Sequence, residues 1–135
     1  MTFSMHTAAE LLGSRRRVLV TGGGGFIGGA LVRRLLREST ATMFNFDKMG
    51  YATDLTSIEE VLAELGDEAE QRHVLQRVDL ANADAVNAAV KKADPDLVMH
   101  LAAESHVDRS ISGPGVFIES NVTGTYNLLQ AVREH

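Results

Sequence analysis

The hydrophobic residues of this chain follow two alternating patterns. Four short segments are rich in Val, Leu, Phe and Met, and each ends in a small or acidic residue: Arg16–Thr21, Ala41–Asp47, His73–Asp79 and Asp96–Ala103. Segments of this length and composition predict β-strands. The first and the last are nearly continuous apolar runs, as expected for strands that are covered on both faces.

Helical patterns fill the intervals between the predicted strands. Apolar residues recur at helical spacing from Phe26 to Leu35, while arginines take the opposite side of that helix. Ser57 and Glu60 match a capping box, which predicts a second helix that ends at Gly66. Each of these two helices follows a predicted strand.

Two further helices complete the pattern. The third is expected over residues 83–93, with Asn82 as its N-cap. Pro114 opens the fourth, because proline is well placed in a first helical turn. We assign its apolar stripe to Val122, Thr125, Leu128, Leu129 and Val132. Strands that alternate with helices imply parallel pairing through right-handed crossovers. The predicted fold class is therefore α/β, a Rossmann-type doubly wound parallel sheet that is truncated after the fourth strand–helix unit.

The domain boundary is placed near residue 16. Residues 17–135 are assigned to the Rossmann domain, and residues 1–16 to an N-terminal extension that we expect to be flexible. Thr7 and Glu10 match a capping box for one short helical turn that Gly13 would stop, but isolated helices of this length are marginal. No internal repeat or linker divides the rest of the chain.

A glycine-rich stretch joins the first predicted strand to the first long helix. Gly22, Gly25 and Gly28 have the spacing G-x-x-G-x-x-G in the strand-to-helix context that this motif requires. The first glycine permits the tight turn, the next lets a pyrophosphate approach the main chain, and the last lets the helix pack closely on the sheet. The phosphates then meet unpaired amides at the positive end of the helix.

Asp47 ends the second predicted strand, 19 residues after Gly28. A carboxylate at this place accepts hydrogen bonds from the adenosine ribose of a dinucleotide and repels a 2′-phosphate, which favours NAD over NADP. The alternative is an aspartate that caps the following turn, which is a common use of this residue. Together with the glycines, Asp47 predicts that the chain binds NAD.

The overall composition narrows the other possibilities. The formal net charge of −5 gives no basic footprint for nucleic acid, and no apolar run is long enough to span a membrane. The chain has no cysteine, which excludes disulfides, thiolate nucleophiles and cysteine-based zinc sites. The lack of cysteine is also consistent with a reducing compartment, and we expect a cytoplasmic location.

From about Arg17 onward the chain resembles the extended short-chain dehydrogenase/reductase superfamily, and within it the nucleotide-sugar 4,6-dehydratases. The stretch VLVTGGGGFIGGALV is common to the superfamily, whereas HLAAESHVDRSISGP is far more specific. The stretches NFDKMGYATDL, VDLANADAV and FIESNVTGTYNLLQAVR extend the resemblance. It implies NAD as cofactor, a nucleotide-sugar substrate of the dTDP-glucose class, and loss of water from the sugar by internal hydride transfer through NAD.

The resemblance also implies roles for single residues. Phe26 and Ile27 would lie at the pyrophosphate, and Asp79 and Leu80 would border the adenine. The other implied cofactor contacts are Lys48, Met49 and Gly50 beside Asp47, then Leu101, Ala102, Ala103, Glu104 and Ser105 along the nicotinamide half, and Ser120. Ser105 would also face the sugar nucleotide, and Asn121 would help to organise the site. Gly24, Gly29 and Gly50 replace the Ala, Ser and Thr that are usual in the family, which loosens cofactor contacts.

The catalytic groups that the resemblance calls for are absent from the sequence. The family chemistry needs a Tyr four positions before a Lys, and an adjacent Asp–Glu pair. Tyr51 is followed four residues on by Leu55, and Tyr126 by Gln130. The pair Asp67–Glu68 is interpreted as part of a solvated polar loop. We therefore assign no catalytic residue and no metal ligand to this chain.

Three functional hypotheses follow. The chain is the NAD-binding part of a nucleotide-sugar dehydratase and is not catalytic alone, or it is a non-catalytic NAD-binding module that docks on a partner, or it belongs to a related NAD-dependent sugar-nucleotide epimerase. The resemblance implies that the fourth helix contributes to a dimer interface, and an exposed apolar edge strand favours self-association. We therefore expect a homodimer, or another association through the fourth helix and this edge strand. His100, which lies in an apolar strand, is interpreted as a hydrogen-bonded core histidine.

Overall fold

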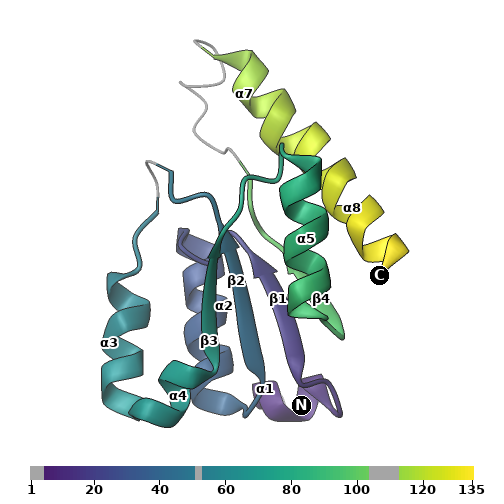
Figure 1. The fold of residues 1–135 in the computed structure, drawn as a ribbon. Coiled ribbons are helices and arrows are strands. Elements are labelled where there is room, and N and C mark those ends of the chain that lie inside the picture. Colours follow the sequence, from purple (N-terminus) through teal and green to yellow (C-terminus); the bar gives the residue numbers. More distant parts are fainter. Residues whose placement is uncertain (1–4, 51–52, 104–112) are drawn as a thin grey trace, which may run out of the picture.

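Four parallel strands form one sheet in the computed structural model, which describes residues 5–50, 53–103 and 113–135 (Figure 1). The strands are β1 (Arg17–Thr21), β2 (Thr42–Asp47), β3 (His73–Arg77) and β4 (Leu97–His100), in the spatial order β3–β2–β1–β4. Because the order reverses after β3, the chain crosses from β3 to the far side of β1 to build β4. This arrangement confirms the predicted doubly wound parallel sheet.

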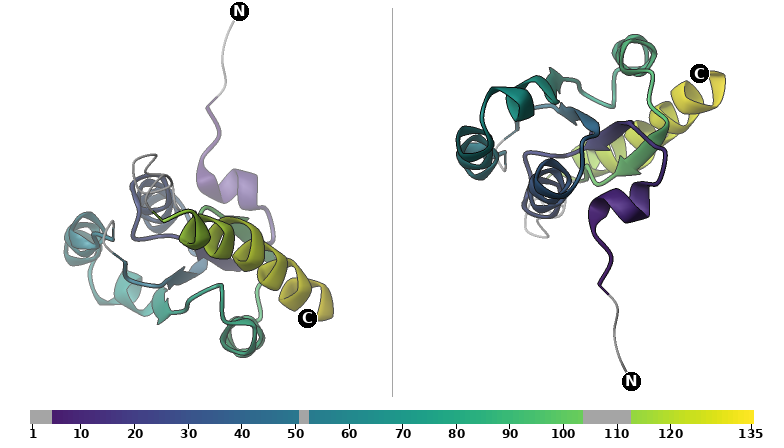
Figure 2. Two further views of the ribbon diagram at one scale, coloured as in Figure 1. Left: turned by 90° about the horizontal axis from the view of Figure 1, so that it is seen from above. Right: turned by 90° about the horizontal axis from the view of Figure 1, so that it is seen from below.

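Side chains alternate between the two faces of the sheet and form two hydrophobic clusters. Val18 and Val20 of β1 belong to the cluster that α1 (Ala8–Leu12), α2 (Phe26–Glu38) and α3 (Thr56–Leu65) cover. Leu19 belongs to the second cluster, which α5 (Ala83–Ala93) and α8 (Gly124–Glu134) cover. All three β1 residues are fully buried, as the continuous apolar pattern predicts. The views along the sheet in Figure 2 show these helices on its two sides.

The helices after β1 and β2 differ from the prediction in their first turns. In α2, Phe26 and Ile27 are 96% and 68% exposed, and the buried side chains begin only at Val32. In α3, the side chain of Ser57 does not cap the helix; the Asp54 carboxylate accepts the Thr56 N–H at 2.9 Å instead. Gly66 ends α3 as expected, with a left-handed φ of 93°.

The segment after α3 is a helix and not the predicted loop. α4 (Asp67–Gln71) is a short polar helix whose Ala69 is fully buried, and the Glu68 carboxylate pairs with Arg72 at 2.6 Å. The third predicted helix is confirmed as α5. Its N-cap Asn82 accepts the Ala85 N–H at 3.1 Å, also as predicted.

The fourth predicted helix consists of three consecutive parts. These are α7 (Pro114–Ile118), a π-helical turn η1 (Glu119–Thr123), and α8. The predicted apolar stripe is only partly correct: Leu128 is buried, but Val122 and Leu129 are 63% and 64% exposed. An exposed apolar stripe therefore runs along the outside of this helix.

The described part of the N-terminal segment is packed, in contrast to the expected flexible extension. Ala8 and Leu12 are buried in the cluster below α2, and Thr7 caps α1 by accepting the Glu10 N–H. The Glu38 carboxylate at the end of α2 accepts the Ala8 N–H at 3.0 Å. This short helix is stabilised by tertiary contacts and not by its own length. The domain boundary near residue 16 stays a prediction.

Candidate functional site

The glycine-rich turn lies where β1 ends and α2 begins, at the carboxyl edge of the sheet. Gly22 has a left-handed φ of 74°, and a Cβ at this position would lie 2.8 Å from the backbone nitrogen of Ala102. A Cβ at Gly28 would collide with the carbonyl oxygen of Gly22. Gly25 is the N-cap of α2 and offers no side chain to its first amides. The first amides of α2 have no intrahelical partners, so the positive end of this helix lies at the glycine turn. Without glycine side chains, a ligand can approach the main chain there.

Asp47 joins this turn to the end of β2. The Oδ2 atom of the buried carboxylate accepts the Gly24 N–H at 2.9 Å. Its Oδ1 atom accepts the Met49 N–H at 2.7 Å and the Thr53 hydroxyl at 2.8 Å. A carboxylate offers about four lone-pair sites, and the residues that the structure describes occupy three of them, which leaves one on Oδ2. Asp47 thus both caps the following turn and presents an acceptor beside the glycines.

Thr21, the last residue of β1, holds the segment after β4 against the turn. Its hydroxyl oxygen accepts the N–H groups of Leu101 at 3.0 Å and Ala102 at 3.1 Å. It also contacts Nδ1 of His100 at 2.6 Å. On the other side of the ring, Nε2 of His100 lies 2.9 Å from the Thr125 hydroxyl of α8. His100 is therefore a hydrogen-bonded histidine, as predicted, and it links two strands to a helix.

A second polar pair lies beneath the turn. Asn45 of β2 is fully buried, and its Nδ2 donates to Nε2 of His73 at 3.2 Å. Burial lowers the pKa of His73, which keeps this ring neutral and able to accept. The Asn45 side chain lies directly below Gly23, where a Cβ would collide with it. A glycine is thus required at position 23 by packing, without reference to any ligand.

The remaining predicted residues fall into three groups. Near the carboxyl edge lie the exposed side chains of Phe26, Ile27, Lys48, Asp79, Leu101 and Ala103, the half-buried Met49 and Ala102, the buried Leu80, and Gly50. Glu104 and Ser105 are outside the described residues, and Ser120 lies in η1. The roles of these residues remain predictions.

Thr21, Thr53 and Asn45 were not predicted from the sequence. Thr21 and Thr53 are hydrogen-bonded to residues of the site, and Asn45 is hydrogen-bonded to His73. The partners of these three residues lie between 6 and 81 positions away in the sequence. The one available signal was for Thr21, a polar residue that ends an apolar strand immediately before the glycines. Thr53 and Asn45 carry no motif that sequence spacing reveals.

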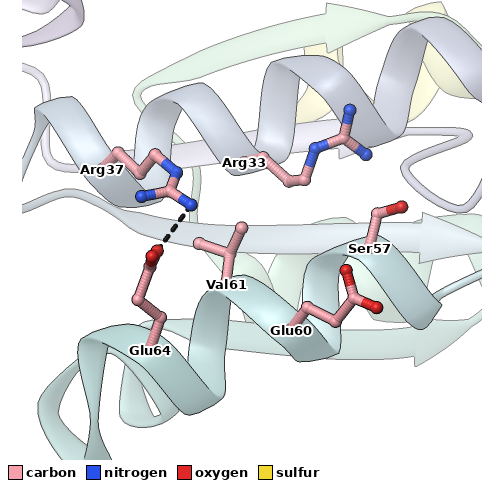
Figure 3. Close-up of a pocket in the computed structure, with 6 residues that line it drawn as sticks. All are labelled: Arg33, Arg37, Ser57, Glu60, Val61 and Glu64. Carbon is pink, nitrogen blue, oxygen red and sulfur yellow. Dashed lines mark ion pairs between the residues drawn. The ribbon is translucent and has the colours of Figure 1, made fainter.

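A shallow pocket lies away from the carboxyl edge, between α2 and α3. It is lined by six residues, as Figure 3 shows: Arg33, Arg37, Ser57, Glu60, Val61 and Glu64. Arg37 and Glu64 pair across it at 2.5 Å, so its charges are partly neutralised. Among the residues that the structure describes, no group of His, Asp and Glu side chains could hold a metal ion. No helix in those ranges is long and apolar enough to cross a membrane.

Comparison with known proteins gives consistent matches. The family model described as GDP-mannose 4,6 dehydratase matches residues 19–135. A dTDP-glucose 4,6-dehydratase of Shigella flexneri is 46% identical over 119 residues, which are 88% of this chain and 31% of that protein. The chain therefore spans about a third of the length of such curated relatives.

Solved structures agree with this match. The dTDP-glucose 4,6-dehydratase from Streptomyces venezuelae, solved with NAD and TYD bound, superposes with a TM-score of 0.75 at 37% identity. The match covers 87% of this chain and 36% of that one. A UDP-glucose 4-epimerase of Thermus thermophilus, solved in complex with NAD, gives a TM-score of 0.70 at 32% identity over 87% of this chain and 34% of the other.

Proposed function

Because the chain belongs to the GDP-mannose 4,6 dehydratase family, we propose that it forms the NAD-binding part of a nucleotide-sugar dehydratase that acts on dTDP-glucose. One observation carries the proposal. The buried carboxylate of Asp47 is held against the Gly24 N–H at 2.9 Å, and the bonds made by the described residues leave one acceptor site on Oδ2. An acceptor beside a glycine turn and a helix N-terminus is the arrangement that binds the ribose and pyrophosphate of a dinucleotide.

The dinucleotide would cross the end of β1. Its pyrophosphate would lie at the first amides of α2, where Gly22 and Gly25 leave the main chain bare. Asp47 would accept a hydroxyl of the adenosine ribose on the β2 side. The nicotinamide half would then extend toward Leu101 and Ala102 after β4, because open α/β sheets bind ligands at the point where the strand order changes. NAD, when bound, supplies a hydride acceptor and donor.

We propose that this chain binds the cofactor but does not turn over substrate alone. The general base that the superfamily resemblance implies is a Tyr four residues before a Lys. Tyr126 is followed by Gln130, and its phenol oxygen accepts a hydrogen bond from the Gln130 amide at 2.9 Å. General acid–base groups each contribute about 10²–10⁴-fold to a rate, so their absence removes turnover.

The same fold supports a self-association surface. Ile118, Val122, Tyr126 and Leu129 recur every three or four residues along α7, η1 and α8, and each is between 58% and 64% exposed. We refer to these four residues as the outer stripe. We propose that the outer stripe, together with the edge strand β4, binds a second copy of the chain. Burial of such a contiguous apolar surface is favourable at about 25 cal/mol per Å².

Calorimetric titration with NAD and NADP tests the cofactor proposal. The folded wild-type chain should bind NAD more tightly than NADP. Asp47→Asn keeps the shape but removes the charge, and it should weaken NAD binding about tenfold or more, since a hydrogen bond to a charged group contributes roughly 1.5–3 kcal/mol. Asp67→Asn, at the start of α4, makes the same charge change away from the carboxyl edge and should leave the affinity unchanged. A folded wild-type chain that releases no heat with NAD would overturn the proposal.

A further inference from the structure

A chain of hydrogen bonds connects β1 to the fourth helix through His100. Thr21 Oγ1 lies 2.6 Å from His100 Nδ1, and His100 Nε2 lies 2.9 Å from Thr125 Oγ1. The Thr125 hydroxyl continues to the carbonyl oxygen of Asn121 at 2.9 Å. Asn121 lies in η1, so the chain of bonds ends within the π-helical turn. We refer to Thr21, His100, Thr125 and the Asn121 carbonyl as the His100 relay.

The donors and acceptors of the His100 relay can be assigned by counting. Thr21 Oγ1 already accepts two N–H groups, from Leu101 and Ala102, which uses both of its lone pairs. Its one hydrogen must therefore be donated to Nδ1 of His100. Since Nδ1 then accepts, the proton of the neutral ring is on Nε2 and is donated to Thr125. Thr125 in turn donates its own hydrogen to the Asn121 carbonyl, as its geometry indicates.

With the proton on Nε2, every donor and acceptor in the His100 relay has a partner. The opposite tautomer would place a third donor on Thr21 and leave the Thr21 hydrogen without an acceptor. Burial lowers the pKa of His100, which also favours the neutral ring. A ring fixed by partners on both sides is a rigid link between β4 and α8.

This link lies at one end of the proposed dinucleotide crevice. The two amides that Thr21 holds belong to the segment against which Gly22 packs, with Ala102 in direct contact. Asp47 and its partners lie on the other side of β1, at the end of β2. π-Helical turns occur frequently at functional sites. The His100 relay therefore positions the backbone of Leu101 and Ala102 at the β4 end of the proposed site. It makes no contact with Asp47 at the β2 end.

We propose that His100, as the Nε2–H tautomer, is a positioning residue for the nicotinamide half of the dinucleotide site, through Leu101, Ala102 and the π-helical turn. The inference rests on the proposed function. A merely structural histidine would affect both halves of the site equally when it is replaced. A positioning histidine affects only the half on the β4 side.

Two ligands separate these outcomes. NAD occupies both halves of the proposed crevice, whereas ADP occupies only the half between the glycine turn and Asp47. His100→Phe, which removes both hydrogen bonds but keeps the ring, should raise the dissociation constant for NAD about tenfold and change that for ADP less than about twofold. His100→Asn retains an acceptor near the place of Nδ1, and should recover most of the NAD affinity. Equal weakening of NAD and ADP by His100→Phe, or no weakening of either, would overturn the proposal.

A spectroscopic measurement keeps the proposal testable if His100→Phe does not fold. The ¹⁵N shifts of the His100 ring in the wild-type chain should show a protonated Nε2 and an unprotonated Nδ1 near neutral pH. A protonated Nδ1 would overturn the assignment. A wild-type chain that shows the expected tautomer but binds neither NAD nor ADP would instead overturn the proposed function, so the two failures can be told apart.

Discussion

Gly24 and Asp47 are joined by a hydrogen bond of 2.9 Å from the backbone N–H of Gly24 to Oδ2 of Asp47. This bond fixes the glycine turn to the end of β2, although the two residues are 23 positions apart. Side chains also lie close to the Cα of Gly24. A Cβ at Gly24 would lie 2.8 Å from the same Oδ2 atom and 2.6 Å from Cγ2 of Thr53. Position 24 is therefore limited by the two side chains that complete the candidate site.

Gly24→Ala should destabilise the chain by about 1–3 kcal/mol, because the added methyl group overpacks a filled space. Thr53→Ser removes Cγ2, the closest atom, and keeps the hydroxyl that donates to Asp47. The double variant should therefore recover part of the loss, with a coupling of about 0.5 kcal/mol or more in a double-mutant cycle. Urea unfolding of the four proteins measures this coupling. Strictly additive values would show that Thr53 does not limit the space at position 24.

The neighbouring glycines of α2 should respond in opposite ways to alanine. A Cβ at Gly28 would collide with the Gly22 carbonyl, whereas one at Gly29 would lie 3.4 Å from the Gly23 carbonyl, an ordinary contact. Gly28→Ala should therefore cost roughly 2 kcal/mol or more, the effect of severe overpacking. Gly29→Ala should be neutral or stabilise by up to about 1 kcal/mol, because alanine favours helix. Thermal unfolding of both variants compares them directly, and equal effects would contradict this account of the turn.

The strands and most helices could be predicted because their periodicity is local. Each strand alternates or is continuously apolar, and the helix N-cap at Asn82 and the C-cap at Gly66 depend on residues within one turn. The placement of Asp47 near the glycines could also be predicted, since the carboxyl ends of adjacent parallel strands meet at one edge. These features follow from spacing in the chain.

The features that were not predicted depend on distant partners. Leu12 stabilises α1 through a cluster that the sequence of α1 cannot reveal, and α4 is held by one buried alanine, Ala69. Phe26 has the helical spacing of a core residue, yet it is 96% exposed, and the buried residues of α2 begin only at Gly28. His100 could be identified as hydrogen-bonded, but its partners Thr21 and Thr125 are 79 and 25 positions away.

A charge introduced into the outer stripe should weaken the proposed dimer. Leu129, within the outer stripe, and Leu11, on the short helix α1, are both 64% exposed. Leu129→Lys should raise the dissociation constant of the dimer about tenfold or more, because it places a charge in an apolar contact. Leu11→Lys makes the same change at an equally exposed leucine outside the outer stripe and should have no effect. Light scattering over a concentration series measures the dimer, and a wild-type chain that stays monomeric would contradict the proposed surface.

Acid should destabilise the chain before its carboxylates titrate. Burial lowers the pKa of His73 in the folded state, whereas in the unfolded chain it returns to about 6.5. The unfolded state therefore binds more protons as the pH falls below this value, and the free energy of unfolding decreases with it. Stability should be level above about pH 7 and should decline toward about pH 5.5, roughly the range between the unfolded histidine and the carboxylates. The effect has this sign for His100 as well, because burial lowers its pKa too.

The variant His73→Gln measures how much of this loss of stability at acid pH is due to His73. Glutamine offers a carbonyl oxygen that can accept from Asn45, as Nε2 of His73 does, but it does not titrate. The variant should lose less stability between about pH 7.5 and about pH 5.5 than the wild-type chain, while His100 continues to contribute to both. Urea unfolding at the two pH values measures the difference. If both proteins lose the same free energy over this range, then protonation of His73 does not couple to folding, and Asn45 is not bound to a ring that must stay neutral.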